Sequence, residues 1–135
     1  MDGTAYDDPL YGNGNRHGLR GKQADDYLVG LGGDDDLLGG TGNDRLWGDQ
    51  SGNTPGTADG ADLVKGQAGD DFLYGEAGND RIVGGNGADS LFGGTGDDTL
   101  IGGLNHRVPL VINTLDGGDG TDTCRWPIDI LTDCD

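Results

Sequence analysis

A nine-residue pattern recurs along most of this chain and constrains its fold more than any other feature. Residues 39–47 read G-G-x-G-x-D-x-U-x, where U is an aliphatic residue. Further copies on the same pattern lie at residues 3–11, 21–29, 30–38, 66–74, 75–83, 84–92 and 93–101. A single nonapeptide of this kind would mean little, but so many copies predict a repeat fold in which each unit packs on its neighbours.

Two positions of the repeat carry most of its chemistry. Position six is aspartate at Asp8, Asp26, Asp35, Asp44, Asp71, Asp80, Asp89 and Asp98. Position eight is aliphatic at Leu10, Leu19, Leu28, Leu37, Leu46, Leu73, Ile82, Leu91 and Leu100. Because side chains alternate between the two faces of a strand, one aliphatic residue per repeat points inward. The core that results is too thin to hold the fold by itself.

The composition points to a metal ion as the missing stabiliser. Thirty glycines and a hydrophobic fraction of 32% would, taken alone, predict a disordered chain. The chain has 25 acidic and 8 basic residues, a formal net charge of −17, and every acid except Glu76 is aspartate. Short carboxylates in glycine-rich turns suit a hard cation, which prefers oxygen ligands. Nucleic acid is excluded as a partner, because phosphate binding needs Lys and Arg.

These residues and their spacing resemble the RTX (haemolysin-type calcium-binding) repeat family over roughly residues 3–125. The resemblance implies an all-β fold, a right-handed parallel β-roll (β-solenoid) of about six coils with a C-terminal cap. In that family the first six residues of a repeat turn around calcium and the last three form a short strand. Two repeats make one coil, so alternate repeats fall on opposite edges of the roll.

The resemblance also assigns metal ligands, since each ion lies between successive turns on one edge. One edge carries Asp8, Asp26, Asp44, Asp71, Asp89 and Asn113, and the other carries His17, Asp35, Asp62, Asp80, Asp98 and Asp122. Backbone carbonyl ligands are expected around Gly39, Gly40, Gly42, Gly75, Gly78, Gly84, Gly85, Gly87, Gly93, Gly94 and Gly96. With the gaps beside His17 and Asn113 weakened, about eight calcium ions are expected, which bring the charge of −17 to about −1. The alternative is a solvated acidic face that binds ions loosely.

Two stretches interrupt the nine-residue register. Residues 48–65 are either two ordinary repeats, with Pro55 pointing inward, or one repeat with an insertion near residues 51–59. We favour the insertion, which puts Val64 inward, because proline removes a hydrogen-bond donor from a strand. Residues 102–116 are interpreted as one repeat enlarged near residues 104–112, with Leu115 inward. The roll is thereby assigned to residues 1–125.

Residues 126–135 are expected to cap the roll, because an open coil exposes apolar side chains and strand edges. Cys124 takes the inward position of the last repeat, and Cys134 follows ten residues later. The pair is either a disulfide formed in an oxidising compartment, which would pin the cap, or two free thiols. The apolar side chains available to cover the last coil are Trp126, Ile128, Ile130 and Leu131.

Aromatic residues gather on one predicted sheet under the insertion interpretation. The outward positions of that sheet hold Tyr11, Tyr27, Val29, Trp47, Phe72, Tyr74 and Phe92, at a strand spacing of roughly 4.8 Å. Such a ladder stabilises a sheet through cross-strand packing. Alternatively, it is a docking face for a neighbouring domain, another roll or a sugar polymer.

The predicted function is calcium-driven folding outside the cell, without catalysis. No Ser-His-Asp, P-loop or dinucleotide signature is present, and paired carboxylates such as Asp25 and Asp26 belong to the repeat. His17 and His106 lack metal-ligand spacing and are interpreted as loop residues without a role. No signal peptide and no membrane-spanning apolar stretch is visible. The resemblance implies an extracellular module of a secreted bacterial protein; the alternatives are a polysaccharide-binding module and a structural or adhesive repeat.

Overall fold

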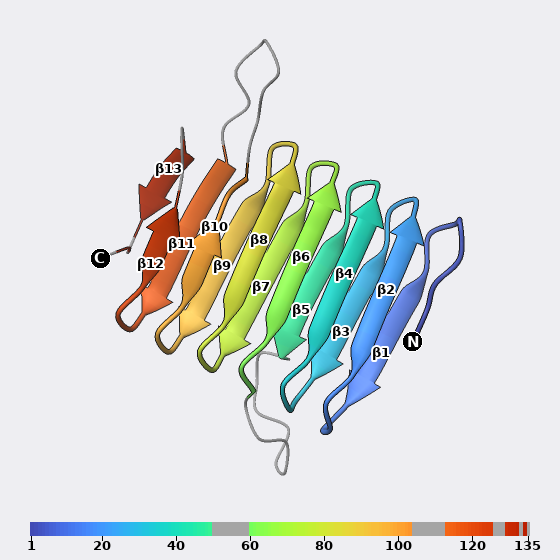
Figure 1. The fold of residues 1–135 in the computed structure, drawn as a ribbon, viewed down its shortest axis with the longest axis horizontal. Coiled ribbons are helices and arrows are strands. Elements are labelled where there is room, and N and C mark those ends of the chain that lie inside the picture. Colours follow the sequence, from blue (N-terminus) through green and yellow to red (C-terminus); the bar gives the residue numbers. More distant parts are fainter. Residues whose placement is uncertain (50–59, 104–112, 126–128, 133, 135) are drawn as a thin grey trace.

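Parallel strands alternate along the chain between two sheets. The computed structural model describes residues 1–49, 60–103, 113–125, 129–132 and 134. The seven-stranded sheet has the order β1 (Pro9–Asn13), β3 (Tyr27–Leu31), β5 (Arg45–Asp49), β7 (Phe72–Ala77), β9 (Ser90–Thr95), β11 (Asn113–Asp119) and β13 (Asp129–Thr132). The six-stranded sheet has the order β12 (Thr123–Arg125), β10 (Thr99–Ile101), β8 (Arg81–Asn86), β6 (Leu63–Ala68), β4 (Asp36–Thr41) and β2 (Gly18–Gln23). Figure 1 shows these strands in chain order along the long axis, with the termini at opposite ends.

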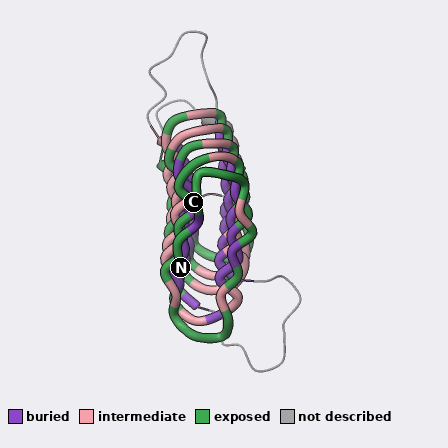
Figure 2. Tube along the Cα trace, turned by 90° about the vertical axis from the view of Figure 1, so that its right-hand side faces the viewer, coloured by how far each residue is buried: buried purple, intermediate pink, exposed green. Residues whose placement is uncertain are grey.

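The predicted all-β parallel β-roll of about six coils is confirmed. One odd-numbered and one even-numbered strand make each coil, from β1 with β2 to β11 with β12, and β13 adds one more strand. Viewed along the roll, the chain traces a flattened loop whose buried residues line the inside of both sheets (Figure 2). Among the described residues no helix is long and apolar enough to cross a membrane.

The register between coils shows where the repeat is interrupted. Partners in successive coils are 18 residues apart in most pairs, such as Leu28 with Leu46. The separation is 27 residues for Leu37 with Val64 and 24 residues for Leu91 with Leu115. In the described part of residues 48–65 one strand begins, β6, and its Val64 is fully buried. The segments 50–59 and 104–112 themselves lie outside the described residues.

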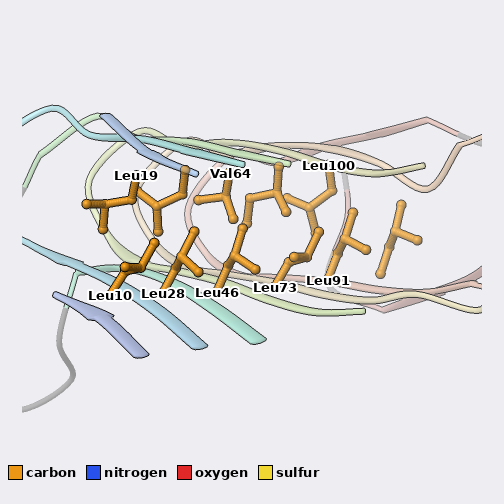
Figure 3. Packing of buried hydrophobic residues seen from close by; sticks show 11 residues of the cluster. Leu10, Leu19, Leu28, Leu46, Val64, Leu73, Leu91 and Leu100 are labelled. Carbon is orange, nitrogen blue, oxygen red and sulfur yellow. The ribbon is translucent and has the colours of Figure 1, made fainter. Parts of the chain in front are cut away.

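A double row of aliphatic side chains fills the space between the sheets (Figure 3). Its members are Leu10, Leu19, Leu28, Leu37, Leu46, Val64, Leu73, Ile82, Leu91, Leu100 and Leu115, with Cys124 packed against them. All except Leu10 and Cys124 are completely removed from solvent. Each buried side chain stabilises the fold by about 1.5–3 kcal/mol, but one per strand leaves a core only two side chains thick.

The strands are longer than the three residues that the repeat pattern predicted, and that expectation is wrong for most of them. β2, for example, has six residues, and Lys22 and Gln23 in its second half pair with Gly40 and Thr41. The first residues of the next repeat thus continue the ladder before the chain turns. Only β10 and β12 have three residues.

At each end of the roll, one further backbone pairing extends a sheet. At the N-terminus, the Gly3 N–H donates to the Arg20 carbonyl at 2.7 Å, which adds a short pairing to β2. At the C-terminus, β13 pairs with β11, and Cys124 and Cys134 form a disulfide with a Cα–Cα distance of 5.8 Å. Of the proposed cap residues, Trp126 and Ile128 lie outside the described residues, whereas Ile130 and Leu131 pair with Thr114 and Leu115 through the backbone of β13.

Candidate metal centre

The position-six residues form two columns, one along each edge of the roll. The first column is Asp8, Asp26, Asp44, Asp71, Asp89 and Asn113, and the second is His17, Asp35, Asp62, Asp80, Asp98 and Asp122, as the sequence predicted. In both columns each backbone N–H except that of the last residue donates to the side-chain Oδ1 of the residue one coil further on, at 2.7–3.1 Å. One oxygen of each such side chain is therefore occupied by the backbone.

The second oxygen of these carboxylates is buried without a hydrogen-bond partner. This holds for Oδ2 of Asp26, Asp35, Asp44, Asp62, Asp71, Asp80 and Asp98. None of these residues exposes more than 3% of its surface. A buried carboxylate oxygen without a partner costs several kcal/mol, and repeated orphan oxygens at equivalent positions fit ligation of a cation.

Glycine at position one makes room for these oxygens. A Cβ built on Gly21 would collide with Oδ2 of Asp26 and would lie 2.6 Å from the carbonyl oxygen of Gly39 in the next coil. A Cβ on Gly75 would collide in the same way with Asp80 Oδ2 and would lie 2.7 Å from the Gly93 carbonyl. A carboxylate of one turn and a carbonyl of the next turn thus converge on the same small space.

The predicted carbonyl ligands divide into two groups. Gly39, Gly75 and Gly93 direct their carbonyls at this space, together with Gly21, Gly30, Gly48, Gly66, Gly102 and Gly117, which the sequence prediction missed; Gly84 borders it. The others have positive φ and lie tightly against a carbonyl of the preceding coil: Gly40, Gly42, Gly78, Gly85, Gly87, Gly94 and Gly96. No group of three or more His, Cys, Asp or Glu side chains in the described part of the chain could hold a metal alone. Backbone oxygens are therefore needed to complete a shell, which suits calcium.

Burial and mutual repulsion make the carboxylates costly to ionise without a cation. Burial raises the pKa of Asp80 to about 8; the Asp62 N–H that it accepts opposes this shift, and the charges of Asp62 and Asp98 add to it. Burial likewise raises the pKa of Asp62 and Asp71 to about 7, and that of Asp44 and Asp98 to about 6. The pKa values of Asp26 and Asp35 are raised for the same reason. A bound dication would stabilise the ionised forms.

His17 stands at the start of the second column, in the loop that precedes β2. Its backbone N–H donates to Oδ1 of Asp35 at 2.7 Å, and its Nδ1 lies 3.6 Å from the same oxygen. An imidazole in place of a carboxylate removes an oxygen ligand from the first gap of this edge. His106 lies outside the described residues.

Asp49 is a buried acid that the sequence prediction overlooked, because it stands at position two rather than six. It exposes 3% of its surface, and its Oδ2 accepts the Gly60 N–H at 3.1 Å. This hydrogen bond joins the two residues that flank the segment 50–59. The charge of Asp49 also contributes to the raised pKa values of Asp62 and Asp80. An aspartate beside an insertion was the only signal for it in the sequence.

The aromatic residues form a continuous ladder on the outside of the seven-stranded sheet. Ring centroids of Tyr11, Tyr27, Trp47, Tyr74 and Phe92 follow one another at 5.9, 4.9, 5.0 and 4.7 Å. The last two contacts are stacked face to face, with interplanar angles of 8° and 9°. Phe72 stands beside the ladder, and the guanidinium carbon Cζ of Arg45 lies over its ring, 5.8 Å from the ring centroid. Val29, expected to face outward, is buried at 5% exposure, since Tyr27 bridges its neighbours Tyr11 and Trp47.

The parallel β-roll and the two columns along its edges define a class of protein: a repeat roll whose glycine-rich turns present oxygen ligands for a hard cation. The family model of the RTX calcium-binding nonapeptide repeat matches the chain in four copies, at residues 19–54, 57–91, 77–106 and 112–125. The chain therefore belongs to the RTX calcium-binding nonapeptide repeat family, a family of structural calcium-binding modules rather than of enzymes. A comparison with curated proteins found no match.

Proposed function

We propose that this chain is a calcium-dependent folding module of a secreted bacterial protein. The buried, partnerless Oδ2 atoms of seven position-six aspartates, from Asp26 to Asp98, are the observation that supports it most directly. About eight ions would lie between turns, held by Asp8, Asp26, Asp35, Asp44, Asp62, Asp71, Asp80, Asp89, Asp98 and Asp122 together with position-one carbonyls.

The net charge explains why the proposed module would be unfolded without calcium and folded with it. With a net charge of −17, the chain repels itself when no cation is bound, and its thin core cannot offset that repulsion. Calcium in the turns removes both the repulsion and the desolvation cost of the carboxylates. Extracellular calcium modules have millimolar to submillimolar affinity, so such a module stays extended in the cytosol and folds after export.

The first experiment follows far-ultraviolet circular dichroism while calcium is added to chelator-treated protein, with magnesium as the control. We expect a cooperative coil-to-β transition with calcium and none with magnesium, which requires a near-ideal octahedral shell and retains water. A spectrum that is already rich in β structure in chelator at pH 8 would refute the proposal.

A matched pair of variants tests the ligand assignment. Asp80→Asn and Asp119→Asn each remove one negative charge, but Asp80 is buried in a position-six column whereas Asp119 is exposed on β11. Asp80→Asn should reduce the calcium stoichiometry measured by calorimetry by about one or two ions, because each column residue faces two gaps. Asp119→Asn should keep the wild-type stoichiometry. Equal losses in the two variants would indicate loose binding to an acidic surface.

In this proposal the aromatic ladder stabilises the roll and does not bind an external ligand. Tyr74 is stacked on both faces, between Trp47 and Phe92, so a sugar ring could reach only its edge. Stacked rings at strand spacing stabilise neighbouring strands. The polysaccharide-binding and adhesive alternatives would need a surface whose ring faces are open.

A further inference from the structure

A second set of side chains links successive turns, at position five of the repeat. On the first edge, Oδ1 atoms of Asp7, Asp25, Asn43 and Asp70 accept the backbone N–H of the position-five residue in the next coil, at 2.8–3.1 Å. On the second edge, Asp34, Asn79 and Asp97 do the same at 2.9–3.1 Å. These seven side chains are called the position-five ladder below.

The position-five ladder differs from the position-six columns in two respects. Its hydrogen bonds run in the opposite direction, from the N–H of a later coil back to the side chain of the earlier one. Its bonds are also exposed, whereas most position-six bonds are buried. An exposed acceptor stays solvated, so this bond forms without a cation to offset desolvation.

Acceptor geometry rather than charge accounts for the residues found in the ladder. Asn43 and Asn79 make the same bond as the aspartates around them, at 2.8 and 2.9 Å. Alanine interrupts the ladder, since Ala61 offers no side-chain acceptor to the next coil. On the first edge, however, Asn43 bonds to Asp70 across the same gap. Each gap between coils, from β1–β2 to β11–β12, therefore keeps at least one position-five bond.

We propose that the position-five ladder positions the turns for calcium. Once two turns meet during folding, it holds them together through a bond that itself needs no ion, so calcium has fewer groups left to order as the roll forms. Preorganisation of this kind raises affinity by reducing the ordering that binding must complete. The inference rests on the proposed calcium-binding function and assigns position five a role distinct from that of the ligands.

Amide hydrogen exchange on the calcium-loaded chain tests the bonds one at a time. Asn43→Ala removes the acceptor of the Asp70 N–H and should reduce the exchange protection of that amide by about three- to tenfold. Ala61→Asn supplies an acceptor at an exposed position and should protect the Asn79 amide by a similar factor. Thr121→Ala is the control, because β12 is the last strand of its sheet and no further coil receives a bond from that side chain.

A second comparison separates the acceptor from the charge. The double variant Asp25→Ala with Asp70→Ala and the double variant Asp25→Asn with Asp70→Asn both remove two charges, but only the first removes two acceptors. The alanine pair should need about 1.5-fold more calcium at the folding midpoint than the asparagine pair, with equal stoichiometry, because two bonds are shared among about eight ions. Equal midpoints, together with an unchanged Asn79 amide in Ala61→Asn, would overturn this inference. A wild-type chain that stays unfolded in calcium would instead refute the proposed function.

Discussion

The central coils of the roll differ from its outer coils although both are built from the same nonapeptide. Burial raises the pKa of Asp80 to about 8 and that of Asp62 and Asp71 to about 7, but only to about 6 for Asp44, one coil before Asp71, and for Asp98, one coil after Asp80. All five side chains are almost fully removed from solvent. The difference therefore reflects the depth of low-dielectric chain packed around each carboxylate, which is greatest about Asp62, Asp71 and Asp80. One motif thus creates its greatest need for a cation in the middle of the roll.

The pH dependence without calcium should show this contrast with the largest effect. A carboxyl group whose pKa is raised from 3.8 in the folded roll stabilises it at low pH, and this stabilisation is lost as the pH rises through the folded value. In chelator, β structure measured by circular dichroism should therefore be greatest near pH 4–5 and should disappear by about pH 8, where Asp80 ionises last. With calcium the order reverses, because protons compete for the same oxygens and acid raises the calcium midpoint. Chelated protein that gains β structure as the pH rises would contradict this account.

Truncation of a core side chain should destabilise the centre of the roll more than its end, although this difference is smaller than the pH effect. Leu73→Ala opens a cavity in the middle of the aliphatic row, where neighbours on both sides hold their positions, and should cost about 2–5 kcal/mol. Leu10→Ala makes the same change in β1, the outermost strand, where the chain can collapse on the gap, and should cost less. Urea unfolding in saturating calcium measures both. Equal losses would mean that the end coil is packed as firmly as the centre.

The features that follow from local periodicity could be predicted from the sequence. Leu28, Leu37 and Leu46 recur every nine residues, so the inward row and the two sheets follow from counting. The register across the first insertion was also within reach, because Pro55 makes a poor inward strand residue. Residues at position six were identified for the same reason as the leucines, since they keep their place in the repeat.

Contacts between coils could not be predicted in the same way. Asp49 is buried and accepts the Gly60 N–H, a contact between residues on either side of a segment that breaks the period. Val29 is covered because Tyr27, in the position before the inward residue, leans across to Tyr11 and Trp47. The position-five acceptors were visible as recurring Asp and Asn, but their partner lies in the next coil. Such contacts need the register between coils, which no local pattern contains.

Substitutions in the aromatic ladder should give the smallest difference in stability between the centre and the end of the roll, and they also test what the ladder is for. Tyr74 stacks between Trp47 and Phe92 at centroid distances of 5.0 and 4.7 Å, whereas Tyr11 touches only Tyr27, tilted by 48°. Tyr74→Leu should therefore cost about 0.5–1.5 kcal/mol in calcium-loaded protein, and Tyr11→Leu should cost less, both measured by urea unfolding. If Tyr74→Leu left stability unchanged, the rings would not be stabilising one another, and an external ligand would become the better explanation for the ladder. A loss at Tyr74 that exceeds the loss at Tyr11 would place the aromatic residues with the leucines, as a second row that ties the central coils together from outside.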